Sequence, residues 1–173
     1  MKNPPDSFLI EAFRDEFRAL RSLAERAAAQ LHDDHWFAQL DAEANSVALL
    51  MKHVGGNLRS RWTDVLATDG EKPDRHRERE FLQEPADTRA GVEATWTAGW
   101  SALFEALDSI RVDDLSREVQ IRGERLALVR ALTRSLAHTA GHVHQIILLA
   151  KHWRGPDWQT LSIPRGAAGP VRP

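Results

Sequence analysis

An apolar run from Leu126 to Trp153 limits most strongly what this chain can fold into, because its hydrophobic residues recur at the spacing of a helix. This pattern predicts a long helix with one buried face. Four polar residues interrupt it at steps of three and four positions: Ser135, His138, His142 and Gln145. A buried polar group without a partner costs about 1–3 kcal/mol, so this polar seam must face partners in the folded protein.

His138 and His142 are one helical turn apart, which places both rings on one face of the helix, about 6 Å from each other. At that spacing, two imidazoles can share one metal ion. The pair is a weak signal by itself, because a chain with eight histidines contains about 0.4 such pairs by chance and a motif needs its structural context. His144 points away from this face, and we interpret it as a flanking residue and not as a ligand.

The length of 173 residues predicts one domain covering residues 1–173, with residues 166–173 as a loose tail. The chain has no cysteine, which excludes disulfides and thiolate ligands and leaves histidine, carboxylates or water for any transition-metal site. Its N-terminus lacks the apolar run of a signal peptide, and no stretch approaches about 18 apolar residues. We therefore expect a cytoplasmic protein without a membrane segment.

Three further amphipathic stretches precede this run, and each predicts a helix. The first begins with Asp6 or Ser7 as its cap and ends near residues 32–35, the second runs from a cap at Asn45 or Ser46 to about Thr68, and the third covers about residues 88–110. Alternation around Gly123 predicts a short extended segment or hairpin. After the last helix, we expect Trp158, Leu161 and Ile163 to lie across the other helices.

A highly charged stretch, residues 69–88, separates the second and third of these helices. Between Arg59 and Glu80 there are six basic and six acidic residues, so no net field attracts phosphate groups, and we expect a salt-bridged crossover and no nucleic-acid partner. Four amphipathic helices with one long charged crossover predict an all-α four-helix bundle, a fold that builds metal sites from inward side chains on facing helices.

His53 lies at the edge of the apolar stripe of the second helix, with Asn57 one turn later and Arg61 one turn beyond that. A single histidine in this position is more often a packing residue than a ligand. It becomes a candidate only because His138 and His142 lack a third ligand.

Several motifs resemble a bacterial domain-of-unknown-function branch of the DinB/YfiT-like superfamily. They are the stretch from Asn45 to Asp64 with Lys52-His53-Val54-Gly55-Gly56-Asn57, the run from Asp69 to Pro73, the spacing His138-x-x-x-His142-x-x-Gln145, and the segment from Trp158 to Gly166. The resemblance covers nearly the whole chain in order. It implies a four-helix bundle, often a homodimer, that carries one divalent metal ion on His53, His138 and His142.

Some members of that superfamily are thiol-dependent S-transferases that use a low-molecular-weight thiol, and others resemble maleylpyruvate isomerases. Three histidines leave a divalent ion, whether zinc, nickel or iron, with at least one open position, as in catalytic sites. We therefore predict a metal-dependent transferase acting on a small-molecule substrate with a thiol as cosubstrate, in which Asn57, Arg61 and Gln145 orient the substrate or the ligands. The alternatives are a metal-assisted hydrolase and a non-catalytic, dimeric helical-bundle binding protein.

Overall fold

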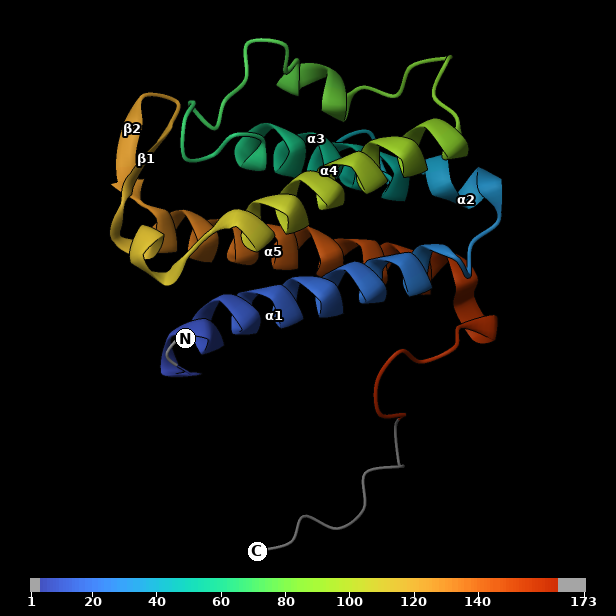
Figure 1. The fold of residues 1–173 in the computed structure, drawn as a ribbon. Helices are drawn as coiled ribbons and strands as arrows, with labels where there is room; N and C mark the ends of the chain where they lie inside the picture. Colours follow the sequence, from blue (N-terminus) through green and yellow to red (C-terminus); the bar gives the residue numbers. More distant parts are fainter. Residues whose placement is uncertain (1–3, 165–173) are drawn as a thin grey trace, which may run out of the picture.

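The four longest helices of the described chain lie side by side in the computed structural model, which describes residues 4–164 and, for side chains, residues 8–164 (Figure 1). α3 packs along α4, α1 packs along α5, and α3 also contacts α5. Buried hydrophobic residues from all four helices form one core. The helices are α1 (Pro4–Ala28), α3 (Val47–Trp62), α4 (Arg89–Ser109) and α5 (Leu128–Arg154).

Two of the helix starts follow from side-chain capping. Ser46 precedes α3, and its hydroxyl accepts a hydrogen bond from the backbone N–H of Leu49 at 3.2 Å. Thr88 precedes α4 and accepts from the N–H of Gly91 at 3.2 Å. In this way each hydroxyl satisfies one of the backbone donors that the first helical turn leaves unpaired. Both starts agree with the sequence prediction.

The predicted bounds of the first two helices were wrong at three ends. α1 begins at Pro4, so Asp6 and Ser7 lie within the helix, and it ends at Ala28. Beyond this point the chain turns into a short helix, α2 (Asp33–Phe37), because Trp36 is buried and its indole N–H donates to the Ala28 carbonyl at 3.1 Å.

α3 ends at Trp62, six positions before the expected Thr68. The left-handed backbone of Asp64, with φ of 49°, follows closely, and such a residue cannot continue a right-handed helix.

A two-stranded antiparallel hairpin precedes α5, as the alternation around Gly123 predicted. β1 (Glu118–Ile121) pairs with β2 (Glu124–Ala127), and the two turn residues, Arg122 and Gly123, have φ of 55° and 77°. Positive φ at both positions suits the twist of a tight hairpin. Since β2 extends to Ala127, α5 begins two residues later than the apolar run suggested. The fold is therefore mostly helical with one small sheet, and not purely α-helical.

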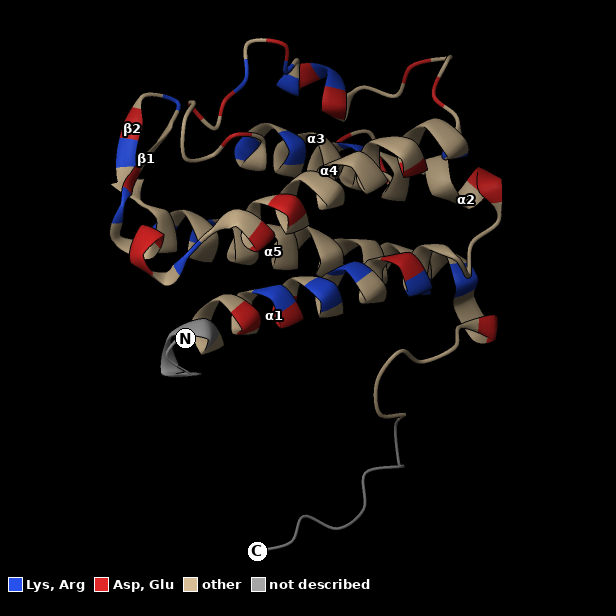
Figure 2. Ribbon diagram, in the orientation of Figure 1, with Lys and Arg blue, Asp and Glu red and all other residues tan. Residues whose placement is uncertain are grey.

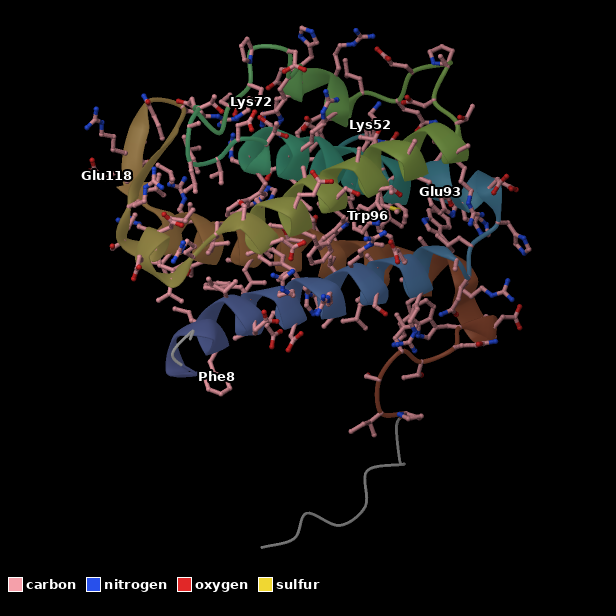
Figure 3. All side chains as sticks on the ribbon, viewed as in Figure 1. Phe8, Lys52, Lys72, Glu93, Trp96 and Glu118 are labelled. Carbon is pink, nitrogen blue, oxygen red and sulfur yellow. The ribbon has the colours of Figure 1, made fainter. Side chains whose placement is uncertain are left out.

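Close contact between α3 and α4 depends on two glycines. A Cβ atom on Gly99 would lie 2.3 Å from the carbonyl oxygen of Gly55, and one on Gly55 would lie 2.6 Å from that of Thr95. The neighbouring tryptophans of α4, Trp96 and Trp100, are buried, and Figure 3 shows Trp96 pointing into the space between the helices. These aromatic residues are part of the core, and Trp96 also lines a small pocket of about 260 Å³ together with Trp36 and Met51.

The crossover between α3 and α4 runs over α3 and contains a 3₁₀ turn, η1 (Arg77–Phe81), that contacts this helix (Figure 1). Acidic and basic residues alternate along the crossover, and ion pairs link them, as expected (Figure 2). None of the helices between residues 4 and 164 is both long enough and apolar enough to cross a bilayer.

The segment after α5 begins with η3 (Gly155–Asp157) and only partly follows the prediction. Trp158 and Leu161 pack against the core, but Ile163 is 72% exposed, so its expected contact with the helices was wrong. The predicted loose tail, residues 166–173, lies outside the described residues.

Candidate metal centre

Three histidine side chains, two from α5 and one from α3, converge on one point. Nε2 of His138 lies 3.1 Å from Nε2 of His53 and 3.2 Å from Nε2 of His142. One ligand atom from each ring can be chosen so that all three lie within 4.8 Å of one another. The helical pair and the third histidine from the facing helix are thus brought together in the arrangement that the sequence reading anticipated.

The three nitrogens suit a metal ion better than they suit one another. Imidazole nitrogens bound to zinc at about 2.0–2.1 Å with tetrahedral angles are about 3.3 Å apart, close to the two short separations here. Between neutral rings, a nitrogen–nitrogen contact of this length needs a proton on one of the two atoms. A proton on Nε2 of His138 can be donated to only one of its two neighbouring rings at a time. The cluster therefore offers more nitrogen lone pairs than protons to occupy them.

A carboxylate fixes the orientation of the His53 ring. Nδ1 of His53 lies 2.8 Å from Oε2 of Glu80, a residue of η1, and His53 and Glu80 are only 3% and 8% exposed. Burial raises the pKa of Glu80, but hydrogen bonds from Arg75 and His53 outweigh this effect and hold the pKa below its usual range. Glu80 is therefore ionised at neutral pH, although it is buried.

Arg75 holds Glu80 in place from the other side. Its Nε and Nη2 donate to the two carboxylate oxygens, each at 2.8 Å, and its side chain is 4% exposed. Two parallel bonds between a guanidinium and a carboxylate fix both position and angle. The carboxylate also lies directly against α3, because a Cβ on Gly56 would be 2.3 Å from Oε1 of Glu80. Gly56 thus leaves the space that Glu80 occupies.

The other members of the polar seam on α5 also have partners. Nδ1 of His142 lies 2.9 Å from Oε1 of Gln145, and the hydroxyl of Ser135 accepts a hydrogen bond from the indole N–H of Trp62 at 3.2 Å. Gln145 therefore contacts the His142 ring and helps to fix its orientation. Within the described chain, Nδ1 of His138 is buried without a hydrogen-bond partner.

The electrostatic environment keeps the seam neutral. Burial, together with smaller effects of the neighbouring His142 and His53, lowers the pKa of His138 from 6.5 to about 4. Burial also lowers the pKa of His142, although its hydrogen bond with Gln145 partly opposes the effect. Neutral imidazole is the form that binds metal ions, so the lowered pKa values of His138 and His142 favour the form that can bind.

The remaining candidates from the sequence lie around this centre or away from it. Asn57 is half-buried one turn after His53 on α3. Arg61 donates to the Gly70 carbonyl at 2.6 Å and to Glu71 at 2.8 Å, so it belongs to the ion pairs at the start of the crossover. A catalytic role for Asn57 or Arg61 stays a prediction.

His144 is exposed, as expected for a flanking residue, and its Nδ1 lies 2.7 Å from the Ala140 carbonyl.

Sequence reasoning missed Glu80 and Arg75, because both lie in the charged crossover, which was read only as a salt-bridged loop. One signal in the sequence could have indicated that another part of the chain comes close to α3 near His53. Gly55 and Gly56 stand together in the middle of a helix, where glycine is unfavourable by about 1 kcal/mol relative to alanine, and this cost marks places where another group comes close. Gly55 meets α4, and Gly56 meets Glu80.

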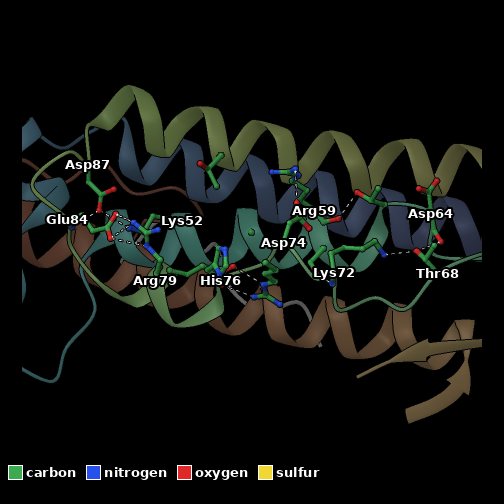
Figure 4. A pocket seen from close by; sticks show the side chains of 16 residues that line it. Lys52, Arg59, Asp64, Thr68, Lys72, Asp74, His76, Arg79, Glu84 and Asp87 are labelled. Atoms are coloured by element: carbon green, nitrogen blue, oxygen red, sulfur yellow. Dashed lines mark hydrogen bonds and ion pairs between the residues drawn. The ribbon is translucent and has the colours of Figure 1, made fainter. Parts of the chain in front are cut away.

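A groove of about 490 Å³ lies between the crossover, α3 and Thr95 of α4 (Figure 4). Arg75 and Glu80 line it, but none of the three clustered histidines does. Its lining includes five basic and five acidic side chains, and several are paired, such as Lys52 with Asp87 at 2.7 Å. This balance of charge gives the groove no preference for a ligand of one sign.

The fold and the histidine cluster together define a mostly helical protein with a site suited to one metal ion. The sequence profile of a family described as proteins of unknown function, DUF1572, matches residues 6–167, and the chain belongs to this family. No protein among the curated ones matches the chain significantly. Membership in the wider DinB/YfiT-like superfamily stays a prediction.

Proposed function

We propose that this protein binds one divalent metal ion through Nε2 of His53, His138 and His142 and uses it in catalysis on a small molecule. The observation that carries the proposal is the convergence of the three Nε2 atoms, with 3.1 and 3.2 Å between His138 and its two neighbours. Two of the rings also have an oxygen atom at Nδ1, which favours a proton there and a lone pair on Nε2. This is the donor set of a zinc, nickel or iron site without thiolates.

Three protein ligands distinguish a catalytic site from a closed structural one, because at least one position of the ion is left for a substrate. A divalent ion held there would supply a Lewis acid that favours deprotonation of a thiol or water near neutral pH. The chain's own contribution is to hold three imidazole rings at fixed angles. Glu80 and Gln145 orient two of these rings through Nδ1.

For the reaction, we propose transfer to or from a low-molecular-weight thiol, within a four-helix bundle of the DinB/YfiT-like type. The support is the resemblance of the sequence to that superfamily, together with a donor set that contains no cysteine to compete with an incoming thiol. A screen of small electrophiles with thiol cosubstrates tests this choice. Hydrolysis of the same substrates without any thiol would favour the metal-assisted hydrolase instead.

Metal content is the decisive measurement for the site. Protein purified without chelator should contain about one divalent ion per chain by elemental analysis. His53→Ala and His142→Ala should each lose most of it. His152→Ala is a matched control, because His152 is an exposed residue of the same helix α5, and this variant should keep its metal.

Two results would contradict the proposal. One is a wild-type protein that contains no metal and takes up neither zinc nor nickel at neutral pH. The other is a metal content that falls equally in His142→Ala and His152→Ala, which would place the ion outside the cluster. Either result would favour the non-catalytic binding protein.

A further inference from the structure

We propose that Glu80 of the crossover is a positioning residue that fixes His53 as the tautomer with its proton on Nδ1 and directs the Nε2 lone pair at His138 and His142. The inference rests on the proposed metal-binding function for its importance, but it concerns the protein's own residues and also holds for the metal-free protein. It gives the charged crossover a role in the site in addition to its role in the fold.

The tautomer follows from the hydrogen bonds around the Glu80 carboxylate. Arg75 donates to both of its oxygens at 2.8 Å, an arrangement that suits an ionised carboxylate. An ionised carboxylate can only accept hydrogen bonds, so at 2.8 Å the Nδ1 of His53 must be the donor. A neutral imidazole carries one proton, and Nε2 is then left with a lone pair. That atom is the one 3.1 Å from His138.

The position of Glu80 is determined on three sides. Arg75 holds it in a bidentate pair, His53 donates to it, and the missing side chain of Gly56 lets its Oε1 approach the backbone of α3. The His53 ring is also covered by Phe81, whose centroid lies 4.4 Å from that of the ring. The 3₁₀ turn η1 thus contributes two consecutive residues that set the orientation of one ligand.

The competing interpretation is that Glu80 only neutralises Arg75 in a network of surface ion pairs. Glu71 offers the direct comparison, because it contacts the same guanidinium at 3.5 Å and pairs with Arg61 and Arg122, yet no described histidine contacts it. If charge balance were the whole role, removing the charge of either carboxylate would have similar effects. If Glu80 positions His53, only its removal alters that ring.

Glu80→Gln and Glu71→Gln are therefore the matched pair, with Glu80→Asp as a second variant that keeps the charge but withdraws it from the ring. The His53 tautomer is read by ¹⁵N-¹H NMR of metal-free, histidine-labelled protein. Zinc affinity is measured by competition with a chromophoric chelator. Loss of such a supporting partner typically lowers metal affinity 10- to 100-fold.

We expect His53 to be protonated on Nδ1 in the wild type and in Glu71→Gln, but to lose this preference in Glu80→Gln and Glu80→Asp. Zinc affinity should fall 10- to 100-fold in the Glu80 variants and less than threefold in Glu71→Gln. Equal losses in Glu80→Gln and Glu71→Gln, or an unchanged His53 tautomer in the folded Glu80 variants, would overturn the proposal. If the wild type takes up no zinc while the tautomer still depends on Glu80, the positioning role stands and the proposed metal function fails.

Discussion

Acidifying the metal-free protein should remove stability through His138. Burial, with smaller effects of nearby histidines and arginines, lowers the pKa of this histidine from 6.5 to about 4 in the folded chain, whereas the unfolded chain keeps the ordinary value. Between these two values the unfolded state binds more protons than the folded state, so stability rises with pH. The contribution of His138 is complete above about pH 6.5 and is lost as the pH falls towards 4.

The size of this effect follows from the shift. At about 1.4 kcal/mol per pKa unit, a fall from 6.5 to about 4 sets an upper limit of about 3 kcal/mol. His138 is only half-buried, and solvent screening reduces the expected contribution to about 1–2 kcal/mol. This loss should occur mostly between pH 6.5 and 4.

Urea denaturation at several pH values, with chelator present, measures this loss. The control is His138→Gln, which keeps a polar side chain at this position but cannot titrate between pH 4 and 7. Both proteins lose stability from carboxylates such as Glu71 and Glu80, whose pKa values are lowered, so the difference between the two curves isolates His138. Parallel curves for the two proteins would refute the reasoning.

Three further predictions follow from the site and the helix contacts. Chelation should lower the melting temperature of the wild type by about 6–10 °C if zinc was a hundredfold above its Kd, and calorimetry should show almost no shift in His142→Ala. Gly99→Ala should destabilise the fold by about 2 kcal/mol or more because its Cβ would lie 2.3 Å from a backbone oxygen, whereas Gly141→Ala, with open space around it, should stabilise α5 by about 0.5–1 kcal/mol in urea titrations. Ser46→Ala should cost about 1 kcal/mol of unfolding free energy, and Ser46→Gly only a few tenths, if the cap of α3 works as described.

Periodicity was enough to place the long helices, because each has an apolar face that must be buried. Local signals were also sufficient for the cap at Ser46 and the turn at Gly123. The ends of α1 and α3 were not predictable in this way. The end of α1 depends on the hydrogen bond from Trp36 to the Ala28 carbonyl, and the end of α3 depends on the left-handed backbone of Asp64. Both features form only when the whole chain folds.

The candidate site, too, was predictable from local sequence patterns only in part. The spacing of His138 and His142 on one face is a property of the helix, so sequence was enough to pair them. His53 could be proposed from the family resemblance, but its distance from His138 depends on how α3 packs against α5. Glu80 is 27 residues from His53 in a charged loop, and nothing in the local pattern distinguishes it from its acidic neighbours. Only the path of the crossover brings it to the ring.

This path would link the proposed metal binding to the crossover. Of the three proposed ligands, His138 and His142 lie on α5 and need only that helix, whereas His53 needs both α3 and the η1 turn that supplies Glu80. A metal ion on all three histidines would favour the state in which Arg75 and Glu80 are in place, so its binding free energy would also stabilise residues 72–82. Hydrogen exchange in this segment should slow when zinc is added and should be unaffected by zinc in His53→Ala. Equal slowing in both proteins would show that the crossover is ordered independently of the ligands.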